Sequence, residues 1–188
     1  FYFITFNLLY MLVIHVISTE DTKMFKCLYT GIDAKVLVNP SKKDAKRAII
    51  EEKDCVMLIG HGTEYGLLNE RLNGFLVGPD MVQFLRGKTV IGIWCYAGNF
   101  AQRYDLKGFF TSNFISNVDE LLDCGFSSFE DAEDHISIEN FKFSAKVNDF
   151  LRNKVSLNEW VDKLQESVKD TQHPFVKYNY EALYYNND

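Results

Sequence analysis

Two stretches decide the fold of this chain: Val56-Met57-Leu58-Ile59-Gly60-His61-Gly62 and Val90-Ile91-Gly92-Ile93-Trp94-Cys95-Tyr96-Ala97-Gly98. Each is an apolar run of the length of a buried strand, and each stops abruptly at a reactive side chain with small residues close by. Neighbouring strands of an open parallel sheet place their last residues side by side at the carboxyl edge, where such folds keep their sites. We therefore predict that His61 faces Cys95 at this edge.

The segments before these runs alternate between strand-like and helix-like patterns. Strands are expected at 1–6, 9–17 and 34–38, and helices at 21–29 and 42–53. The second helix has an apolar face of Ala45, Ala48 and Ile49, and Ile50 is left open as a fourth member. Such alternation predicts right-handed crossovers and an α/β fold of three layers, with a mostly parallel sheet and helices on both faces. We expect one domain, residues 1–188.

The remaining pattern predicts a hairpin, one more strand and a helical C-terminal part. The hairpin has Asn73-Gly74 at its tip. A capping box formed by Ser156 and Glu159 is expected to open the last long helix. The tyrosine-rich tail is expected to pack back on the core. The ranges are 66–77 for the hairpin, 78–85 and 99–104 for short helices, 108–115 for the strand, 127–153 (interrupted) and 157–170 for the long helices, and 178–185 for the tail.

Composition excludes several classes of protein. The chain has 188 residues, of which 47% are hydrophobic and 15% aromatic, so it is not disordered. Its net charge of -6 offers no basic surface for nucleic acid. The four cysteines form no CxxC pair, which argues against a zinc ribbon and a disulfide framework and favours a reducing compartment, the cytoplasm. No motif predicts a metal or a cofactor.

The amino terminus is almost continuously apolar from Phe1 to Ser18. It carries no Lys or Arg before Lys23 and has no small-residue cleavage pattern, so it does not resemble a secretory signal. It is also short for a membrane span. We therefore expect two strands here and no membrane partner.

The two motifs resemble those of the caspase-haemoglobinase (clan CD) cysteine peptidases, which include caspases, legumain, gingipains, clostripain and separase. This family has an apolar block ending in His-Gly and, a few tens of residues later, another ending in the catalytic Cys. The resemblance covers roughly Met11 to Asn117 and implies a caspase-like fold and a cysteine-type endopeptidase. Trp94 departs from the pattern, because the family often has Ala or Gly before the cysteine.

The resemblance implies a role for each residue of the proposed site. Cys95 is the nucleophile and His61 the acid/base group, since a thiol with a pKa of about 8.5 needs a neighbouring base or cation to react at neutral pH. The N–H groups of Gly62 and Cys95 form the oxyanion hole. The imidazole of this family commonly needs no carboxylate, so neither Glu64 nor Asp105 is assigned to a triad.

Substrate specificity is the least determined property. Relatives recognise the residue before the scissile bond with the loop after the first strand and the positions before the nucleophile, which here are Thr19, Glu20, Asp21, Ile93 and Trp94. Glu20 and Asp21 favour Lys or Arg, but helix capping also explains them, and Ile93 with Trp94 favours an apolar residue.

Other interpretations remain open. Cysteines and histidines at strand ends are most often structural, and His15, His135 and His173 are expected to be packed or on the surface. A catalytically silent caspase-like module for binding or regulation is one alternative. A chelatase-like enzyme is another, because a strand ending in Gly-His-Gly-Thr also resembles sirohydrochlorin chelatases. The expected partner is a protein or peptide substrate, and an oligomer remains open.

Overall fold

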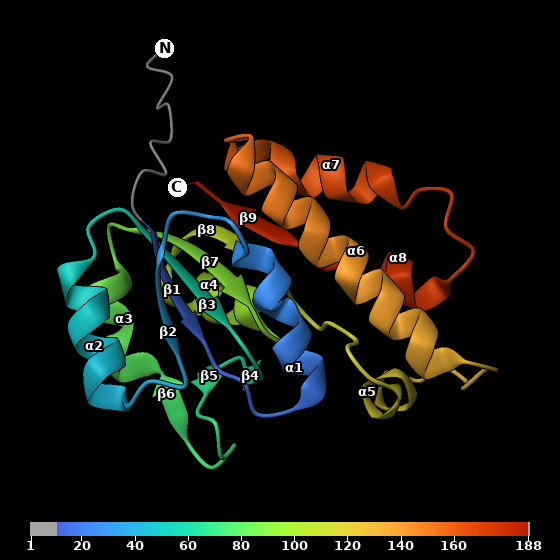
Figure 1. Cartoon of the computed structure of the whole chain (residues 1–188), viewed down its shortest axis with the longest axis horizontal. Helices are drawn as coiled ribbons and strands as arrows, with labels where there is room; N and C mark the ends of the chain where they lie inside the picture. The colour runs from blue at the N-terminus through green and yellow to red at the C-terminus, as the bar shows by residue number, and fades with distance from the viewer. Residues whose placement is uncertain (1–10, 188) are drawn as a thin grey trace.

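A six-stranded sheet forms the centre of the computed structural model, which describes residues 11–187 (Figure 1). Its strand order is β2-β1-β3-β7-β8-β9. The first five strands run parallel, and β9 is antiparallel to β8. The prediction of an α/β fold with a mostly parallel sheet is confirmed. The strands are β1 (Met11–His15), β2 (Lys35–Val38), β3 (Cys55–Ile59), β7 (Thr89–Ile93), β8 (Lys107–Phe110) and β9 (Tyr184–Asn186).

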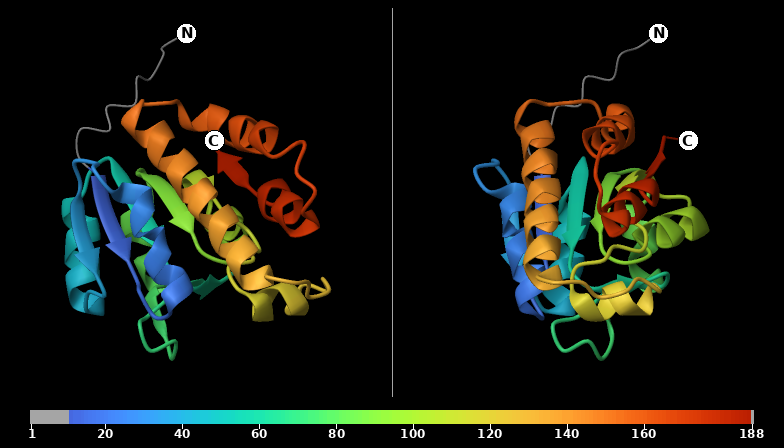
Figure 2. Two further views of the ribbon diagram at one scale, coloured as in Figure 1. Left: turned by 45° about the vertical axis from the view of Figure 1, so that its right-hand side comes forward. Right: turned by 90° about the vertical axis from the view of Figure 1, so that its right-hand side faces the viewer.

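Helices cover both faces of this sheet (Figure 2). Successive side chains of a strand point to opposite faces, so Met11 and Val13 enter one hydrophobic cluster and Leu12 and Ile14 the other. The first cluster includes residues of η1, α6, α7 and α8, and the second includes residues of α2, α3 and α4. These helices are η1 (Phe25–Tyr29), α2 (Lys42–Glu51), α3 (Val82–Leu85), α4 (Ala97–Tyr104), α6 (Ala132–Arg152), α7 (Trp160–Ser167) and α8 (Pro174–Glu181).

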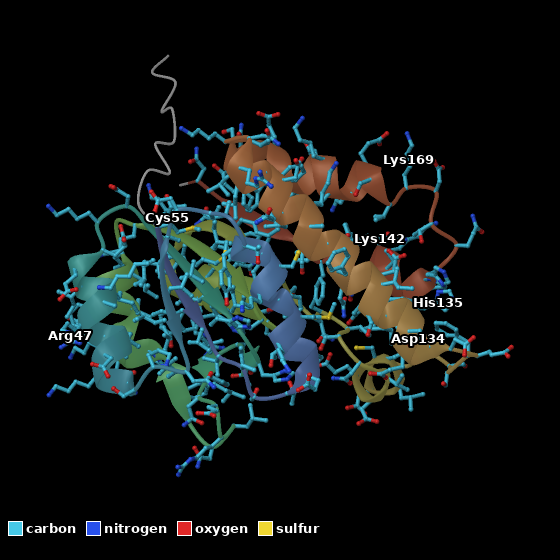
Figure 3. All side chains as sticks on the ribbon, in the orientation of Figure 1. Arg47, Cys55, Asp134, His135, Lys142 and Lys169 are labelled. Atoms are coloured by element: carbon cyan, nitrogen blue, oxygen red, sulfur yellow. The ribbon has the colours of Figure 1, made fainter. Side chains whose placement is uncertain are left out.

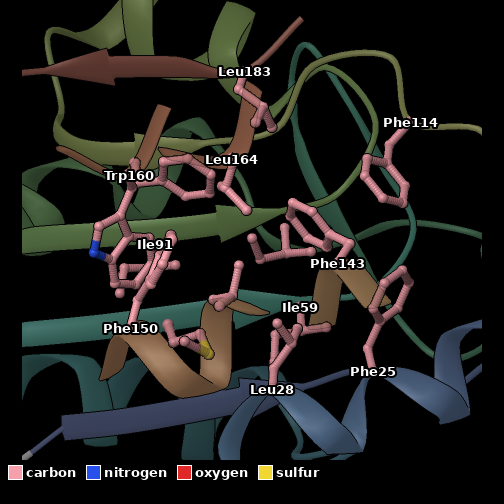
Figure 4. Packing of buried hydrophobic residues seen from close by; sticks show 14 of the residues in the cluster. Phe25, Leu28, Ile59, Ile91, Phe114, Phe143, Phe150, Trp160, Leu164 and Leu183 are labelled. Atoms are coloured by element: carbon pink, nitrogen blue, oxygen red, sulfur yellow. The ribbon is translucent and has the colours of Figure 1, made fainter. Parts of the chain in front are cut away.

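The first cluster joins the sheet to the C-terminal helices (Figure 4). The ring of Trp160 on α7 packs edge-on against Phe109 of β8, with 5.2 Å between the ring centroids. Leu164 is buried beside it, and Val161 and Val168 pack at the border of the cluster. Burying each large apolar side chain contributes about 1.5–3 kcal/mol. These side chains form the apolar face by which α7 packs on the sheet.

Several helix boundaries differ from the sequence predictions. The 127–153 segment begins its helix only at Ala132 and then runs without interruption to Arg152. A helix that was not predicted, α5 (Val118–Asp123), precedes it, because the Asn117 side chain accepts a hydrogen bond from the Glu120 N–H and caps it. Ser156 precedes η3 (Leu157–Glu159), but its side chain makes no capping hydrogen bond, so the predicted capping box is wrong.

The strand predicted at 108–115 is shorter than expected. It ends at Phe110, and the chain then turns across the carboxyl edge of the sheet. Gly108 has φ +135°, and a Cβ there would lie 1.9 Å from the Val90 carbonyl oxygen, so the close approach to β7 requires glycine. The tyrosine-rich tail does return to the core, but it supplies α8 and the edge strand β9.

The predicted hairpin is present within a small antiparallel sheet of β4 (Gly62–Thr63), β5 (Gly66–Leu68) and β6 (Phe75–Val77). Its turn is longer than an Asn-Gly tip, because it is closed by a 2.8 Å hydrogen bond from Asn69 N to Gly74 O. The helix after it divides into η2 (Pro79–Met81) and α3. Since β4 begins at Gly62, the small sheet starts directly after His61.

Two predictions concern the amino terminus. The strand expected at 1–6 lies outside the described residues, and the one expected at 9–17 corresponds to β1. None of the helices within residues 11–187 has the length and apolar character that crossing a bilayer requires.

Candidate active site

His61 and Cys95 lie at the ends of two adjacent parallel strands. Ile59, the last residue of β3, pairs with Ile93, the last residue of β7, and each reactive side chain follows its strand by two residues. Both side chains line one pocket. The residues that line it are Thr22, Phe25, Gly60, His61, Ile93, Trp94, Cys95, Thr111, Phe114 and Ser116.

His61 is held through its Nε2 atom. This atom lies 2.9 Å from Thr19 Oγ1 and 3.5 Å from Asp21 Oδ2. Thr19 precedes the short helix α1 (Glu20–Met24) on the loop after β1, so this loop reaches across to the end of β3. Within residues 11–187, Nδ1 of His61 has no hydrogen-bond partner. No other described residue therefore engages the lone pair or proton of this atom.

Asp21 is a well-held carboxylate next to this histidine. Its Oδ2 atom accepts hydrogen bonds from Ser116 Oγ at 2.8 Å and from Asn117 Nδ2 at 3.3 Å. Burial alone would raise the pKa of Asp21, but the hydrogen bonds from Thr19 and Ser116, the charge of His61 and the amide of Asn117 outweigh it and lower that pKa. Asp21 is therefore ionised at neutral pH.

The Cys95 thiol points toward the loop after β8. Its Sγ atom lies 3.4 Å from the carbonyl oxygen of Phe114 and 4.0 Å from Oε1 of Glu120. Burial, followed by the negative charge of Glu120, raises the pKa of Cys95 to about 12. In this state the residue is a thiol that donates to Phe114, and among the described residues it shares no hydrogen bond with His61.

The backbone around Cys95 is tightly constrained. Its N–H donates to no protein acceptor within residues 11–187, whereas the N–H groups of Trp94 and Tyr96 donate to Thr111 and Ser112. Tyr96 has φ 69°, a left-handed conformation that costs a bulky residue about 1–2 kcal/mol. Such strain collects at functional sites. The free N–H and the sharp turn together leave a donor beside the Cys95 sulfur.

Gly62 and Trp94 fit closely against each other. A Cβ on Gly62 would lie 2.0 Å from Trp94 Cδ1, and the Trp94 indole N–H donates to the Thr63 carbonyl oxygen at 3.1 Å. Trp94 thus fills the space that a side chain at position 62 would need. Gly62 itself pairs with Leu67 in the small sheet and is not part of the pocket lining.

Of the residues assigned to substrate binding, all but Glu20 lie at the pocket or contact His61. Ile93 and Trp94 line the pocket, and Asp21 contacts His61. Glu20 is exposed and pairs with Lys23 at 3.2 Å, so it does not line the pocket. The sequence analysis did not identify Ser116, which donates a hydrogen bond to Asp21, or Glu120, which lies near the Cys95 sulfur. The signal that points to Ser116 is its place in the loop after β8, the next strand whose carboxyl end reaches this edge.

The other histidines lie outside the pocket. His15, at the end of β1, is fully buried, with Nδ1 2.9 Å from the Tyr29 hydroxyl and Nε2 2.8 Å from the Thr22 carbonyl oxygen. It holds α1 and η1 against the sheet. His135 lies near the start of α6 (Figure 3). Its ring centroid lies 4.9 Å from that of His173. Residues 11–187 contain no group of three or more His, Cys, Asp and Glu side chains arranged to hold a metal ion.

Comparison of the chain with protein-family models, with curated proteins and with solved structures finds no match.

Proposed function

We propose that this chain is a cysteine endopeptidase in which Cys95 is the nucleophile and His61 the acid/base group. The observation that carries the proposal is the convergence of these two side chains in one pocket at the ends of adjacent parallel strands. The parallel sheet with helices on both faces and a helical C-terminal part supports the caspase-like fold that the two motifs imply.

The proposed reaction uses groups already present in the pocket. Nδ1 of His61 takes the proton of the Cys95 thiol while Sγ bonds to the carbonyl carbon of the peptide. The oxyanion that forms accepts a hydrogen bond from the Cys95 N–H. His61 then gives its proton to the leaving amine as the C–N bond breaks, and a thioester remains. Water attacks the thioester carbonyl, His61 takes its proton, and the carboxylic acid leaves as the thiol is restored.

The thiol must first leave its resting contact. It donates to Phe114 and carries a raised pKa, so the free chain holds little thiolate at neutral pH. Catalytic hydrogen bonds are often long in free enzymes and tighten when substrate binds. We propose that substrate turns Sγ away from Phe114 and toward His61.

The proposed substrate is a protein or peptide. Four of the lining residues, Phe25, Ile93, Trp94 and Phe114, are large and apolar, and Thr22 and Ser116 add polar contacts. Glu20 points to solvent and Asp21 faces His61, so neither offers a free carboxylate to a cation. The lining therefore favours an apolar side chain before the scissile bond over Lys or Arg.

The four free cysteines fit a reducing compartment such as the cytoplasm.

One observation favours a second candidate, a catalytically silent module. The raised pKa keeps Cys95 protonated, and the thiol contacts the Phe114 carbonyl oxygen and shares no hydrogen bond with His61 among the described residues. A binding or regulatory protein with an intact but unused dyad would have the same geometry.

Peptide-library cleavage separates the two candidates. The endopeptidase is expected to cleave peptides, and Cys95→Ala and His61→Ala to abolish cleavage without unfolding the chain. Cys27→Ala is the matched control, because Cys27 lies on η1 and does not line the pocket. Cleavage that survives in Cys95→Ala contradicts the assignment. Absence of cleavage by the wild-type chain, together with tight binding of a partner protein, supports the silent module.

A further inference from the structure

The contacts at Nε2 of His61 determine which ring nitrogen carries the proton of the neutral imidazole. Asp21 Oδ2 lies 3.5 Å from Nε2, and an ionised carboxylate can only accept hydrogen bonds. A lone pair on Nε2 would therefore face a negative charge and be repelled. The neutral imidazole thus carries its proton on Nε2, which leaves the lone pair on Nδ1.

The Thr19 hydroxyl can link His61 to Asp21 through hydrogen bonds. It is 2.9 Å from His61 Nε2, and its hydrogen bond to Asp21 helps to lower the pKa of that carboxyl. A hydroxyl has one proton and two lone pairs, so it can accept from Nε2–H and donate to the carboxylate at the same time. Asp21 in turn is fixed by Ser116 and Asn117. Its charge is therefore oriented before His61 reacts.

We propose that Asp21, acting directly and through the Thr19 hydroxyl, is a positioning residue that holds His61 as the Nε2–H tautomer with Nδ1 free to take the Cys95 proton. The kinetic part of this inference rests on the proposed peptidase function, whereas the tautomer does not. The third group of the site thus comes from the loop after β1.

The tautomer is measured by NMR of the chain labelled with ¹⁵N-histidine, because protonated and unprotonated ring nitrogens differ in chemical shift. His61→Asn assigns the signals. At alkaline pH the wild-type His61 is expected in the Nε2–H form. Asp21→Asn and Thr19→Val are each expected to shift it toward a mixture that includes Nδ1–H. Asp80→Asn is the matched control, since Asp80 is exposed, pairs with Lys42 and lies outside the pocket.

Kinetics supply the second measurement. Loss of a group that orients a catalytic side chain typically costs about 10- to 100-fold in activity, so Asp21→Asn is expected to lower kcat by that factor. KM is expected to change by less than about two-fold, because Asp21 is not part of the pocket lining. Asp21→Glu is expected to restore part of kcat, and Asp80→Asn to leave both parameters unchanged.

The outcomes distinguish this inference from the proposed function. A wild-type His61 in the Nδ1–H form, or a tautomer that is unchanged in both variants, overturns the inference. If the wild-type chain cleaves no peptide while both variants shift the tautomer, the peptidase proposal fails and the positioning role stands. Because Asp21→Asn also weakens the hydrogen bonds that Ser116 and Asn117 donate to this side chain, thermal melting is recorded for each variant, and Thr19→Val decides the test if Asp21→Asn unfolds.

Discussion

The Cys95 Sγ atom lies 3.4 Å from the Phe114 carbonyl oxygen, on the side of the pocket where Glu120 also approaches. Burial, followed by the negative charge of the Glu120 carboxylate, raises the pKa of the thiol to about 12, although a backbone hydrogen bond at Phe114 opposes this rise. The Glu120 carboxylate on α5 therefore adds to the effect of burial on how readily Cys95 ionises. A single substitution removes this added contribution.

We predict that Glu120→Gln makes Cys95 more reactive. Removing the negative charge lowers the pKa of the thiol, while the amide oxygen of Gln can still accept from the Ser116 N–H. Each unit by which the pKa falls increases the thiolate fraction at pH 8 about ten-fold. The measurement is the rate of Cys95 alkylation by iodoacetamide, followed by mass spectrometry. Asp119→Asn, an exposed neighbour on α5, is the control, and an unchanged rate in Glu120→Gln would show that burial alone governs the thiol.

The strand ends of the site could be predicted from sequence. An apolar run that stops at His61, followed by another that stops at Cys95, carries the information locally, and the rules of parallel sheets place the two ends together. The contacts of Asp21 could not be predicted. Its partners Ser116 and Asn117 are almost a hundred residues away, and nothing in the local sequence shows that the loop after β8 folds back over the loop after β1.

The edge strand β9 was missed for a related reason. It has only three residues, Tyr184–Asn186, and it becomes a strand because the free edge of β8 offers backbone partners. Within the chain the same tyrosines read equally well as a helix or a loop. Pairing partners, rather than intrinsic preference, decide the conformation of so short a segment.

We predict that Gly62→Ala destabilises the chain by about 1–3 kcal/mol, the usual cost of an added methyl group in a packed region. The new Cβ would lie 2.0 Å from Trp94 Cδ1 and 2.7 Å from the Gly66 carbonyl oxygen, so the backbone or the indole must move. Urea denaturation measures the change. Gly74→Ala in the hairpin turn is the control, because its nearest neighbour would be 3.5 Å away. Equal effects of the two substitutions would contradict the close fit of Gly62 against Trp94.

We predict that the free energy of unfolding decreases as the pH falls below about 6.5. Burial, together with the charge of Lys26, lowers the pKa of His15 from its ordinary 6.5, although the hydrogen bond to Thr22 opposes this. Below that pH the unfolded chain binds a proton that the folded chain resists, so stability is lost at up to about 1.4 kcal/mol per pH unit. The loss continues until the pH reaches the lowered pKa of the folded state.

The control for this prediction is His15→Gln. This variant is expected to be less stable than the wild type at pH 7.5, because it loses contacts with Tyr29 and Thr22, but its stability should vary less between pH 7.5 and 5. The Asp21 carboxyl has a lowered pKa, and its contribution is lost only at pH values below its ordinary 3.8, outside this window. Equal pH slopes for the two proteins would rule out His15 as the cause.

We predict that peptides with Leu before the scissile bond are cleaved faster than otherwise identical peptides with Arg or Asp. The pocket next to Cys95 presents Phe25, Ile93, Trp94 and Phe114, and Asp21 is already engaged by His61 and Ser116. An Arg side chain would lose its hydration there without gaining a free carboxylate, which disfavours it. The measurement is the ratio of kcat/KM values for the three peptides. A preference for Arg that disappears in Glu20→Gln would show instead that the exposed carboxylate of α1 recognises the substrate and that its pairing with Lys23 opens on binding.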